Sequence, residues 1–218
     1  MVSLYARSVN LADAGGDRAF GVAVYFHRPP IDPVAGEPAF IGGGICGGRR
    51  KLTDNIKKWI ITGGGLGLLK PAPGSWGSCG PALIWWMLLW LNASPLLRTG
   101  VSLMVILAAG FFTVRLGPWA ESYFGKKDPG QVVLDEYAGY LTATLLLPVP
   151  GKCIGHLWGA WIAAAVVYVL FRLTDTLKLP PCRQLEQLPA GWGVFWDDIA
   201  AGLQVNILLQ IVLRIALH

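Results

Sequence analysis

The chain has 218 residues, of which 54% are hydrophobic and only 14% are charged. Soluble domains carry about 25% charged residues, so this composition excludes a disordered chain and argues against an ordinary soluble monomer. The net charge of +5 is small, which argues against nucleic-acid binding and suits the anionic face of a membrane. We therefore predict an all-α protein, a compact multi-helix bundle embedded in a membrane. The composition does not indicate an oligomeric state.

Residues 1–50 differ from the rest of the chain. They are rich in proline and glycine, as in the run Arg28-Pro-Pro-Ile-Asp-Pro33, and no helical or strand period persists there. We predict a poorly ordered extension over residues 1–50 and a helical membrane domain over residues 51–218.

Five apolar segments follow, separated by short polar connectors. They are Ala82–Leu91, Thr99–Val114, Tyr137–Val149, Ile154–Phe171 and Ile199–Leu213. Only segment 154–171 reaches the length of about 18 residues that a helix needs to span a bilayer comfortably. We expect the other four to be tilted, half-inserted or buried in protein.

Positive charges are distributed unequally between the two sides of these segments. The connectors 49–81, 115–136 and 172–198 hold twelve Lys and Arg residues. The three on the opposite side are Arg98, Lys152 and Arg214. Loops that face the cytoplasm carry an excess of Lys and Arg. We therefore predict a multi-pass protein of the inner (plasma) membrane whose basic side faces the cytoplasm.

Acidic residues gather on that same side, at the ends of apolar segments. Five of them form three units, Asp135-Glu136, Asp175 and Asp197-Asp198. An unpaired carboxylate is costly at the edge of a membrane, so carboxylates persist there where they pair with cations or bind a metal. We expect acidic clusters at the cytoplasmic helix ends.

The first acidic unit can be placed on a helix. The run Asp128-Pro-Gly-Gln131 matches a capping box, which predicts a helix that begins at Asp128 and holds Asp135 two turns inside. Gly139 follows Asp135 after one turn, and Gly202 follows Asp198 at the same spacing. Because small residues let helices approach closely, we expect the two acidic pairs to meet between helices.

Two further elements could bind an anion. Arg172, Asp175 and Lys178 recur every third residue and share one helix face, as a structural ion-pair ladder or as contacts to a metal and a phosphate. The run from Lys70 to Ser78 is predicted to be a loop, whose glycines and hydroxyls can present N–H groups to an anion before a helix.

Together these motifs resemble the phosphatidylglycerophosphatase A family, over roughly residues 57–215. The patterns are Pro73-Gly-Ser-Trp-Gly-Ser78, Asp128-Pro-Gly-Gln-Val-Val-Leu-Asp135-Glu136-Tyr-Ala-Gly139, Phe171-Arg172-Leu-Thr-Asp175-Thr-Leu-Lys178 and Asp197-Asp198-Ile-Ala-Ala-Gly202. Ser75 replaces the family's Thr and keeps the hydroxyl, whereas Leu179 replaces a proline. The resemblance implies a Mg²⁺-dependent membrane phosphatase that converts phosphatidylglycerophosphate, an anionic phospholipid, into phosphatidylglycerol.

This interpretation gives each motif a role. Mg²⁺ takes hard oxygen ligands and bridges carboxylates to phosphate. The metal ligands would be Asp135, Glu136, Asp175, Asp197 and Asp198. The catalytic set would be Asp135, Glu136, Asp175 and Asp198. Substrate phosphate would be held by Ser75, Ser78, Arg172 and Lys178. The sequence leaves open which carboxylate is the general base.

Two other classes of function use the same residues. A small cation-coupled membrane transporter could use the carboxylates as a cation path, and a scaffold protein could hold them in structural ion pairs. A transporter should carry its acids near the middle of the segments. Here they lie at the ends, which favours chemistry on a lipid headgroup.

Overall fold

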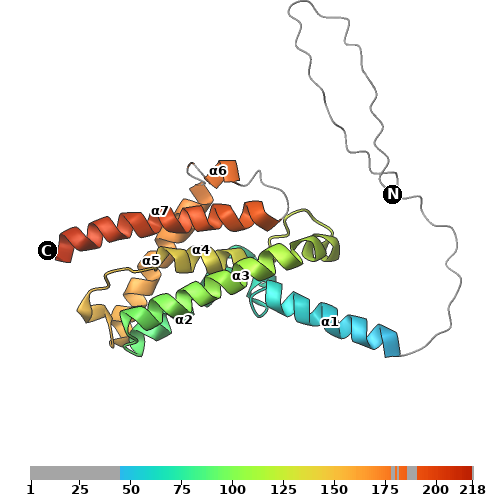
Figure 1. Cartoon of the computed structure of the whole chain (residues 1–218), viewed down its shortest axis with the longest axis horizontal. Coiled ribbons are helices and arrows are strands. Elements are labelled where there is room, and N and C mark those ends of the chain that lie inside the picture. The colour runs from blue at the N-terminus through green and yellow to red at the C-terminus, as the bar shows by residue number, and fades with distance from the viewer. Residues whose placement is uncertain (1–44, 178–179, 181, 186–190, 218) are drawn as a thin grey trace, which may run out of the picture. The chain divides into compact units, whose positions relative to one another are not determined.

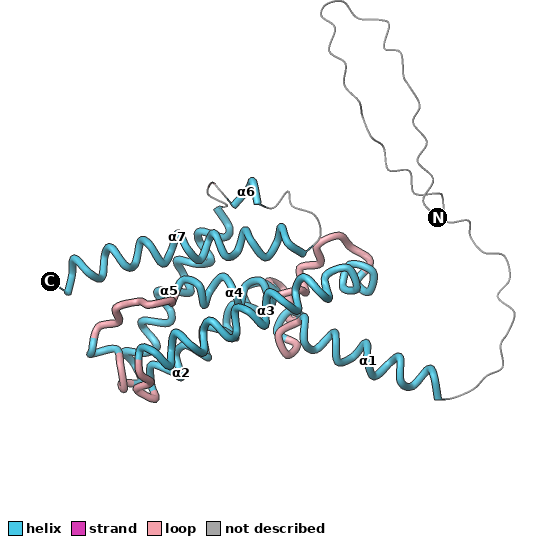
Figure 2. Tube along the Cα trace, in the orientation of Figure 1, coloured by secondary structure: helices cyan, strands magenta, loops and turns pink. Residues whose placement is uncertain are grey.

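The computed structural model describes residues 45–177, 180, 182–185 and 191–217 (Figure 1). The described chain is helical, without a strand in these ranges, so the all-α prediction is confirmed (Figure 2). The helices are α1 (Ile45–Ile61), α2 (Pro73–Trp90), α3 (Pro95–Phe124), α4 (Leu134–Ala143), α5 (Leu157–Leu177), α6 (Cys182–Leu185) and α7 (Gly191–Leu217), with the short 3-10 turns η1 (Leu66–Leu68) and η2 (Gly151–Cys153).

Three helices, α3, α5 and α7, are long and apolar enough to cross a membrane by length and composition. The expectation that only segment 154–171 reaches this length is wrong. Helix α3 has 30 residues because it continues through Arg115 and Glu121, and α7 has 27 because it begins well before Ile199. Charged residues close to a helix end can reach the membrane surface, so they do not have to end the helix.

Helix α4 is the buried centre of the bundle. It contacts α2, α3, α5 and α7, and eight of its ten residues are buried. At about 1.5 Å per residue it is far too short to cross a hydrocarbon layer of about 30 Å. The structure therefore buries the helical part of the predicted segment 137–149 in protein and ends its helix at Ala143, after which Leu146 is exposed.

Helices α4 and α7 cross at two glycines, as the sequence predicts. A Cβ atom on Gly139 would lie 2.7 Å from the backbone oxygen of Asp198. A Cβ atom on Gly202 would overlap the backbone oxygen of Gly139. Only glycine permits this approach, which sets the first turn of α4 beside Asp197 and Asp198.

Helix α4 begins later than the sequence predicts. Its N-cap is Val133, and Asp128 lies in the preceding turn with a φ of 49°. The backbone N–H of the fully buried Val133 donates to the carbonyl of Ile61, which fixes the chain outside a helix at this point. The predicted capping box at Asp128 is therefore wrong. Asp135 and Glu136 occupy the first turn of α4, where the helix dipole favours negative charge.

The boundary that the sequence predicts between the extension and the membrane domain falls inside helix α1. This helix begins at Ile45, before the boundary predicted at residue 50. Residues 1–44 lie outside the described residues, so the poorly ordered character of the extension stays a prediction.

Candidate functional site

A cavity of about 220 Å³ lies where the starts of α2, α4 and α7 meet the end of α5. Its lining residues are Pro73, Gly74, Asp128, Gly130, Val132, Asp135, Glu136, Asp175, Val194, Asp197 and Asp198. All five carboxylates selected from the sequence line this one cavity, although they come from three separate helices. We call it the acidic cavity.

Asp135 and Asp198 carry the least compensated charges of this cavity. They are only 4% and 5% exposed, and neither forms an ion pair with a described Lys or Arg. Asp135 accepts a 3.0 Å hydrogen bond from the backbone N–H of Glu136. Burial, followed by the negative charge of Glu136, raises the pKa of Asp135 well above its usual value. The described Lys and Arg residues therefore leave Asp135 and Asp198 without a compensating positive charge.

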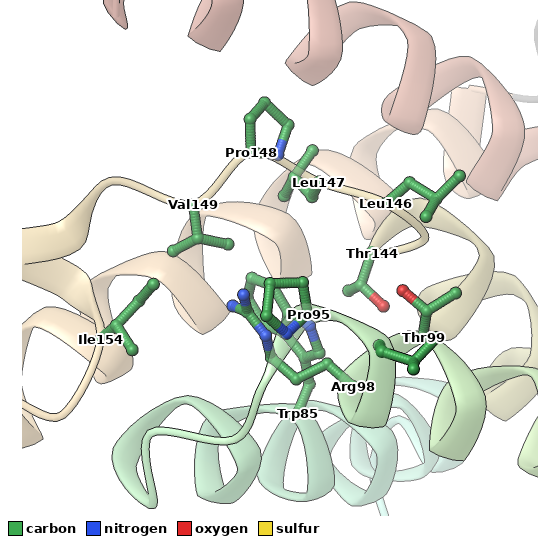
Figure 3. Close-up of a pocket in the computed structure, with 11 residues that line it drawn as sticks. Trp85, Pro95, Arg98, Thr99, Thr144, Leu146, Leu147, Pro148, Val149 and Ile154 are labelled. Carbon is green, nitrogen blue, oxygen red and sulfur yellow. The ribbon is translucent and has the colours of Figure 1, made fainter.

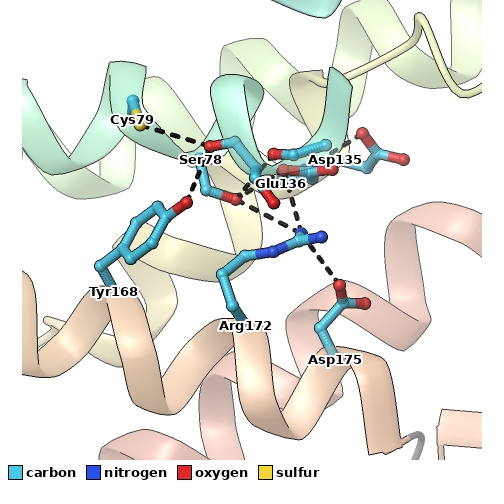
Figure 4. Close-up of polar contacts among 9 residues, drawn as sticks. Ser78, Cys79, Asp135, Glu136, Tyr168, Arg172 and Asp175 are labelled. Carbon is cyan, nitrogen blue, oxygen red and sulfur yellow. Dashed lines mark hydrogen bonds and ion pairs between the residues drawn. The ribbon is translucent and has the colours of Figure 1, made fainter. Parts of the chain in front are cut away.

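A polar network borders the same cavity (Figure 4). Arg172 Nη1 lies 2.9 Å from Asp175 Oδ2 and 3.2 Å from Glu136 Oε2. The hydroxyl of Ser78 donates to Glu136 Oε2 at 2.5 Å. Burial raises the pKa of Glu136 to about 7, although Arg172 and Ser78 act in the opposite direction. Arg172 thus links the acids of α4 and α5.

The start of α2 packs against Glu136 through glycines. A Cβ atom on Gly74 would overlap Glu136 Oε1, and one on Gly77 would lie 3.2 Å from Glu136 Oε2. Because α2 begins at Pro73, Ser75 and Ser78 are helical, and the prediction that they lie in a loop is wrong. The cavity instead meets the first residues of α2, and a helix N-terminus favours an anion.

The predicted phosphate-binding residues have different positions. Ser78 and Arg172 both contact Glu136 at the border of the cavity. Ser75 does not line it, and its backbone oxygen accepts hydrogen bonds from Tyr168 and Cys79. Lys178 lies outside the described residues.

Sequence reasoning missed two residues near this site. Asp128 lines the cavity but was explained as a helix cap. Tyr168 donates a 3.0 Å hydrogen bond to Ser75 and so ties α5 to the start of α2. Its spacing of one turn before Arg172, on the same helix face, is the signal that could have found it.

The donors of the acidic cavity fit a hard divalent cation such as Mg²⁺. In the described ranges no three acidic, histidine or cysteine side chains are grouped closely enough to hold a metal by themselves. Mg²⁺ does not need such a group, because it keeps several waters and uses one or two carboxylates beside a substrate phosphate. A volume of about 220 Å³ leaves room for waters of roughly 30 Å³ each.

Comparison with known proteins identifies relatives of this chain. Residues 59–213 match the family model described as phosphatidylglycerophosphatase A. A proposed phosphatidylinositol-3-phosphatase from Bacteroides thetaiotaomicron is 34% identical over 70% of this chain and 90% of its own length. Proteins named phosphatidylglycerophosphatase A from Haemophilus influenzae and Escherichia coli are 32% and 28% identical, over 69% and 66% of this chain and 84% and 76% of their own lengths. No solved structure matches.

Proposed function

Because this chain belongs to the phosphatidylglycerophosphatase A family, we propose that it hydrolyses phosphatidylglycerophosphate to phosphatidylglycerol and phosphate with the help of Mg²⁺. Membership of the family makes it a lipid phosphatase, a phosphoric monoester hydrolase. The observation that carries the proposal is the acidic cavity, in which carboxylates from α4, α5 and α7 face the N-terminus of α2. Phosphatidylglycerophosphate is an anionic phospholipid with a terminal phosphomonoester.

The residues of the cavity supply the groups that this hydrolysis needs. Water adds to phosphorus, the bond to the glycerol oxygen breaks, and that oxygen takes up a proton. Asp135, Asp197 and Asp198 would hold Mg²⁺, which when bound neutralises charge on the phosphate. Glu136 has a pKa of about 7, which suits a group that takes or returns a proton near neutral pH.

Arg172 and the start of α2 would orient the phosphate. Arg172 lies 3.2 Å from Glu136 and 2.9 Å from Asp175, which both line the cavity, and its side chain is 22% exposed. A guanidinium binds phosphate oxygens well because its donors match their geometry. Asp175 holds Arg172 in place in this structure and is proposed to act with it.

The substrate can be identified by phosphate release from the purified protein in detergent with Mg²⁺. Phosphatidylglycerophosphate, phosphatidylinositol 3-phosphate and phosphatidic acid should be compared at equal concentration, because the names of the relatives cover the first two. We expect the highest kcat/KM with phosphatidylglycerophosphate. A clear preference for phosphatidylinositol 3-phosphate would replace the proposed substrate.

Two variants control this assay. Asp198→Asn removes one carboxylate from the cavity and should lower the release of phosphate, which excludes a contaminating phosphatase. Glu121→Gln removes a carboxylate of α3 that does not line the cavity and should behave like the wild type. Equal activity in all three proteins would show that the cavity is not the site of the reaction.

We further propose that the acidic cavity faces the cytoplasm from the inner membrane. The basic connectors on its side of the bundle carry this proposal. In a variant whose four native cysteines are replaced by serine, single cysteines at the exposed positions Lys127 and Lys152, on opposite sides, can be treated in intact cells with a maleimide that does not cross the inner membrane. Labelling of Lys152→Cys alone is expected, and labelling of Lys127→Cys alone would invert the orientation.

A further inference from the structure

A second cavity has a volume of about 490 Å³, and Figure 3 shows the residues that line it. It lies toward the other ends of α2 and α4 from the acidic cavity. Helices α2 and α4 begin at the acidic cavity, whereas Trp85 of α2 and Thr144 at the end of α4 line this second one. Most of its lining is apolar. The apolar lining residues are Trp85, Pro95, Leu96, Leu146, Leu147, Pro148, Val149 and Ile154. We call it the Arg98 cavity.

Arg98 is the charged residue of this lining, and its charge is uncompensated. The residue is only 8% exposed, and its Nε and Nη1 atoms are buried without a hydrogen-bond partner. No acidic residue in the described part of the chain forms an ion pair with it, and none lines the cavity. In Figure 3 the guanidinium points into the space between Pro95 and Val149.

A buried guanidinium without a partner requires an explanation. Arginine keeps its charge in proteins, so it cannot relieve the cost of burial by losing a proton. Breaking up a buried pair leaves a strongly destabilising charge, which shows how much a matching anion stabilises such a site. The hydroxyl of Thr144, which also lines the cavity, donates to the carbonyl of Leu141 at 2.7 Å and accepts no hydrogen bond from Arg98 Nε or Nη1. The described residues therefore supply no anion for Arg98.

We propose that the Arg98 cavity binds an anionic membrane phospholipid, with Arg98 contacting the phosphodiester and the acyl chains lying against the apolar rim. Arg98 lies in the first turn of the spanning helix α3, which is the depth of lipid headgroups and the positive end of the helix dipole. Leu96 and Leu146, at the rim, are 84% and 70% exposed. A small free anion would leave this apolar lining unused.

The proposed lipid site is separate from the acidic cavity. The described residues that line the Arg98 cavity include no carboxylate or histidine, the groups that commonly activate water. The test of this site uses a lipid without a terminal phosphate, so it does not depend on the identity of the substrate.

The test uses purified full-length protein in a neutral detergent and measures lipid binding by native mass spectrometry and thermal melts. Phosphatidylserine is the probe, because it is an anionic phosphodiester without a terminal phosphate. Phosphatidylcholine is the zwitterionic control, and inorganic phosphate tests for a free-anion site. We expect phosphatidylserine to bind at least tenfold more tightly than phosphatidylcholine and to raise the melting temperature.

Three variants connect this preference to the cavity. Arg98→Gln should remove it, and should leave the lipid-free protein as stable as the wild type or more so, because an uncompensated buried charge is gone. Thr99→Asp, which adds a competing carboxylate to the lining, should also remove it and covers the case in which Arg98→Gln does not fold. Arg214→Gln changes an exposed arginine near the end of α7 and should keep the preference.

Other outcomes would overturn the proposal. They are equal binding of the two lipids by the wild type, an unchanged preference in both Arg98→Gln and Thr99→Asp, or a stabilisation that inorganic phosphate reproduces without lipid.

Discussion

The two cavities of this protein pose opposite electrostatic problems. In the acidic cavity, carboxylates come from three helices, and Arg172 pairs with those of two of them, Glu136 of α4 and Asp175 of α5. In the Arg98 cavity a single guanidinium lies among apolar side chains. Helices α2 and α4 contribute to both cavities. The same helices therefore border an excess of negative charge at one cavity and an excess of positive charge at the other. The sign of the uncompensated charge is the basis of the two proposed ligands, a cation with a phosphate at one end and an anionic headgroup at the other.

The largest expected effect is the loss of activity on removal of divalent cations. Without a cation, burial and nearby negative charges raise the pKa values of Asp135 and Glu136, and the acidic cavity holds no metal to neutralise the charge of a phosphate. Excess chelator should abolish the release of phosphate, and added Mg²⁺ should restore it. Mg²⁺ should also raise the melting temperature of the wild type but not change lipid binding at the Arg98 cavity. Full turnover in excess chelator would show that the reaction does not need a metal in the acidic cavity.

Neutralising one buried carboxylate should have the next largest effect. Asp135→Asn keeps the size of the side chain but removes a carboxyl group that pairs with no described Lys or Arg. Turnover should fall on the order of a hundredfold, the scale of losing a preorganised electrostatic group, while the stability of the metal-free protein holds or rises. Phosphate release and thermal melts in detergent measure both, with Glu121→Gln as the control.

Asp175→Asn provides the contrast within the same cavity. Asp175 pairs with Arg172 at 2.9 Å, so its neutralisation should lower stability as well as turnover. If Asp135→Asn were destabilised as strongly as Asp175→Asn, the role of Asp135 would be structural rather than catalytic.

The sequence predicts the helix crossing better than the helix boundaries. The spacing of Gly139 and Gly202 from their acidic residues is local, and a pair of small residues at a crossing favours one arrangement. The start of α4 depends instead on a distant contact, the hydrogen bond from Val133 to Ile61, which overrides a good capping pattern at Asp128. From the sequence, Arg98 can be recognised only as a positive charge on the side of the membrane opposite the acidic residues. In the structure it shares a cavity with residues from the distant segment after α4, namely Thr144, Leu146, Leu147, Pro148 and Val149.

The glycine crossing yields a prediction of intermediate size. In Gly202→Ala the new methyl group would overlap the backbone oxygen of Gly139, so α4 and α7 must move apart. Overpacking of this kind costs about 1–3 kcal/mol. Thermal melts should show the loss, and turnover should fall because Asp135 and Asp198 separate. Gly100→Ala, at a position with open space in α3, is the matched control. A Gly202→Ala protein as stable as Gly100→Ala would contradict the close crossing.

The smallest expected effect separates the two cavities by their response to pH. Glu136 has an ordinary pKa of 4.5 and a folded pKa of about 7, raised mainly by burial, and the pKa of Asp135 shifts in the same direction. Between these values the unfolded chain ionises while the folded protein keeps its proton, so the contribution of Glu136 to stability is full below pH 4.5 and is lost as the pH rises to about 7. Melts of the metal-free protein should show a falling melting temperature across this window. The fall should be shallower in Glu136→Gln but unchanged in Arg98→Gln, because a guanidinium does not titrate there. A profile that Glu136→Gln leaves unchanged would show that Glu136 does not retain its proton in the folded protein.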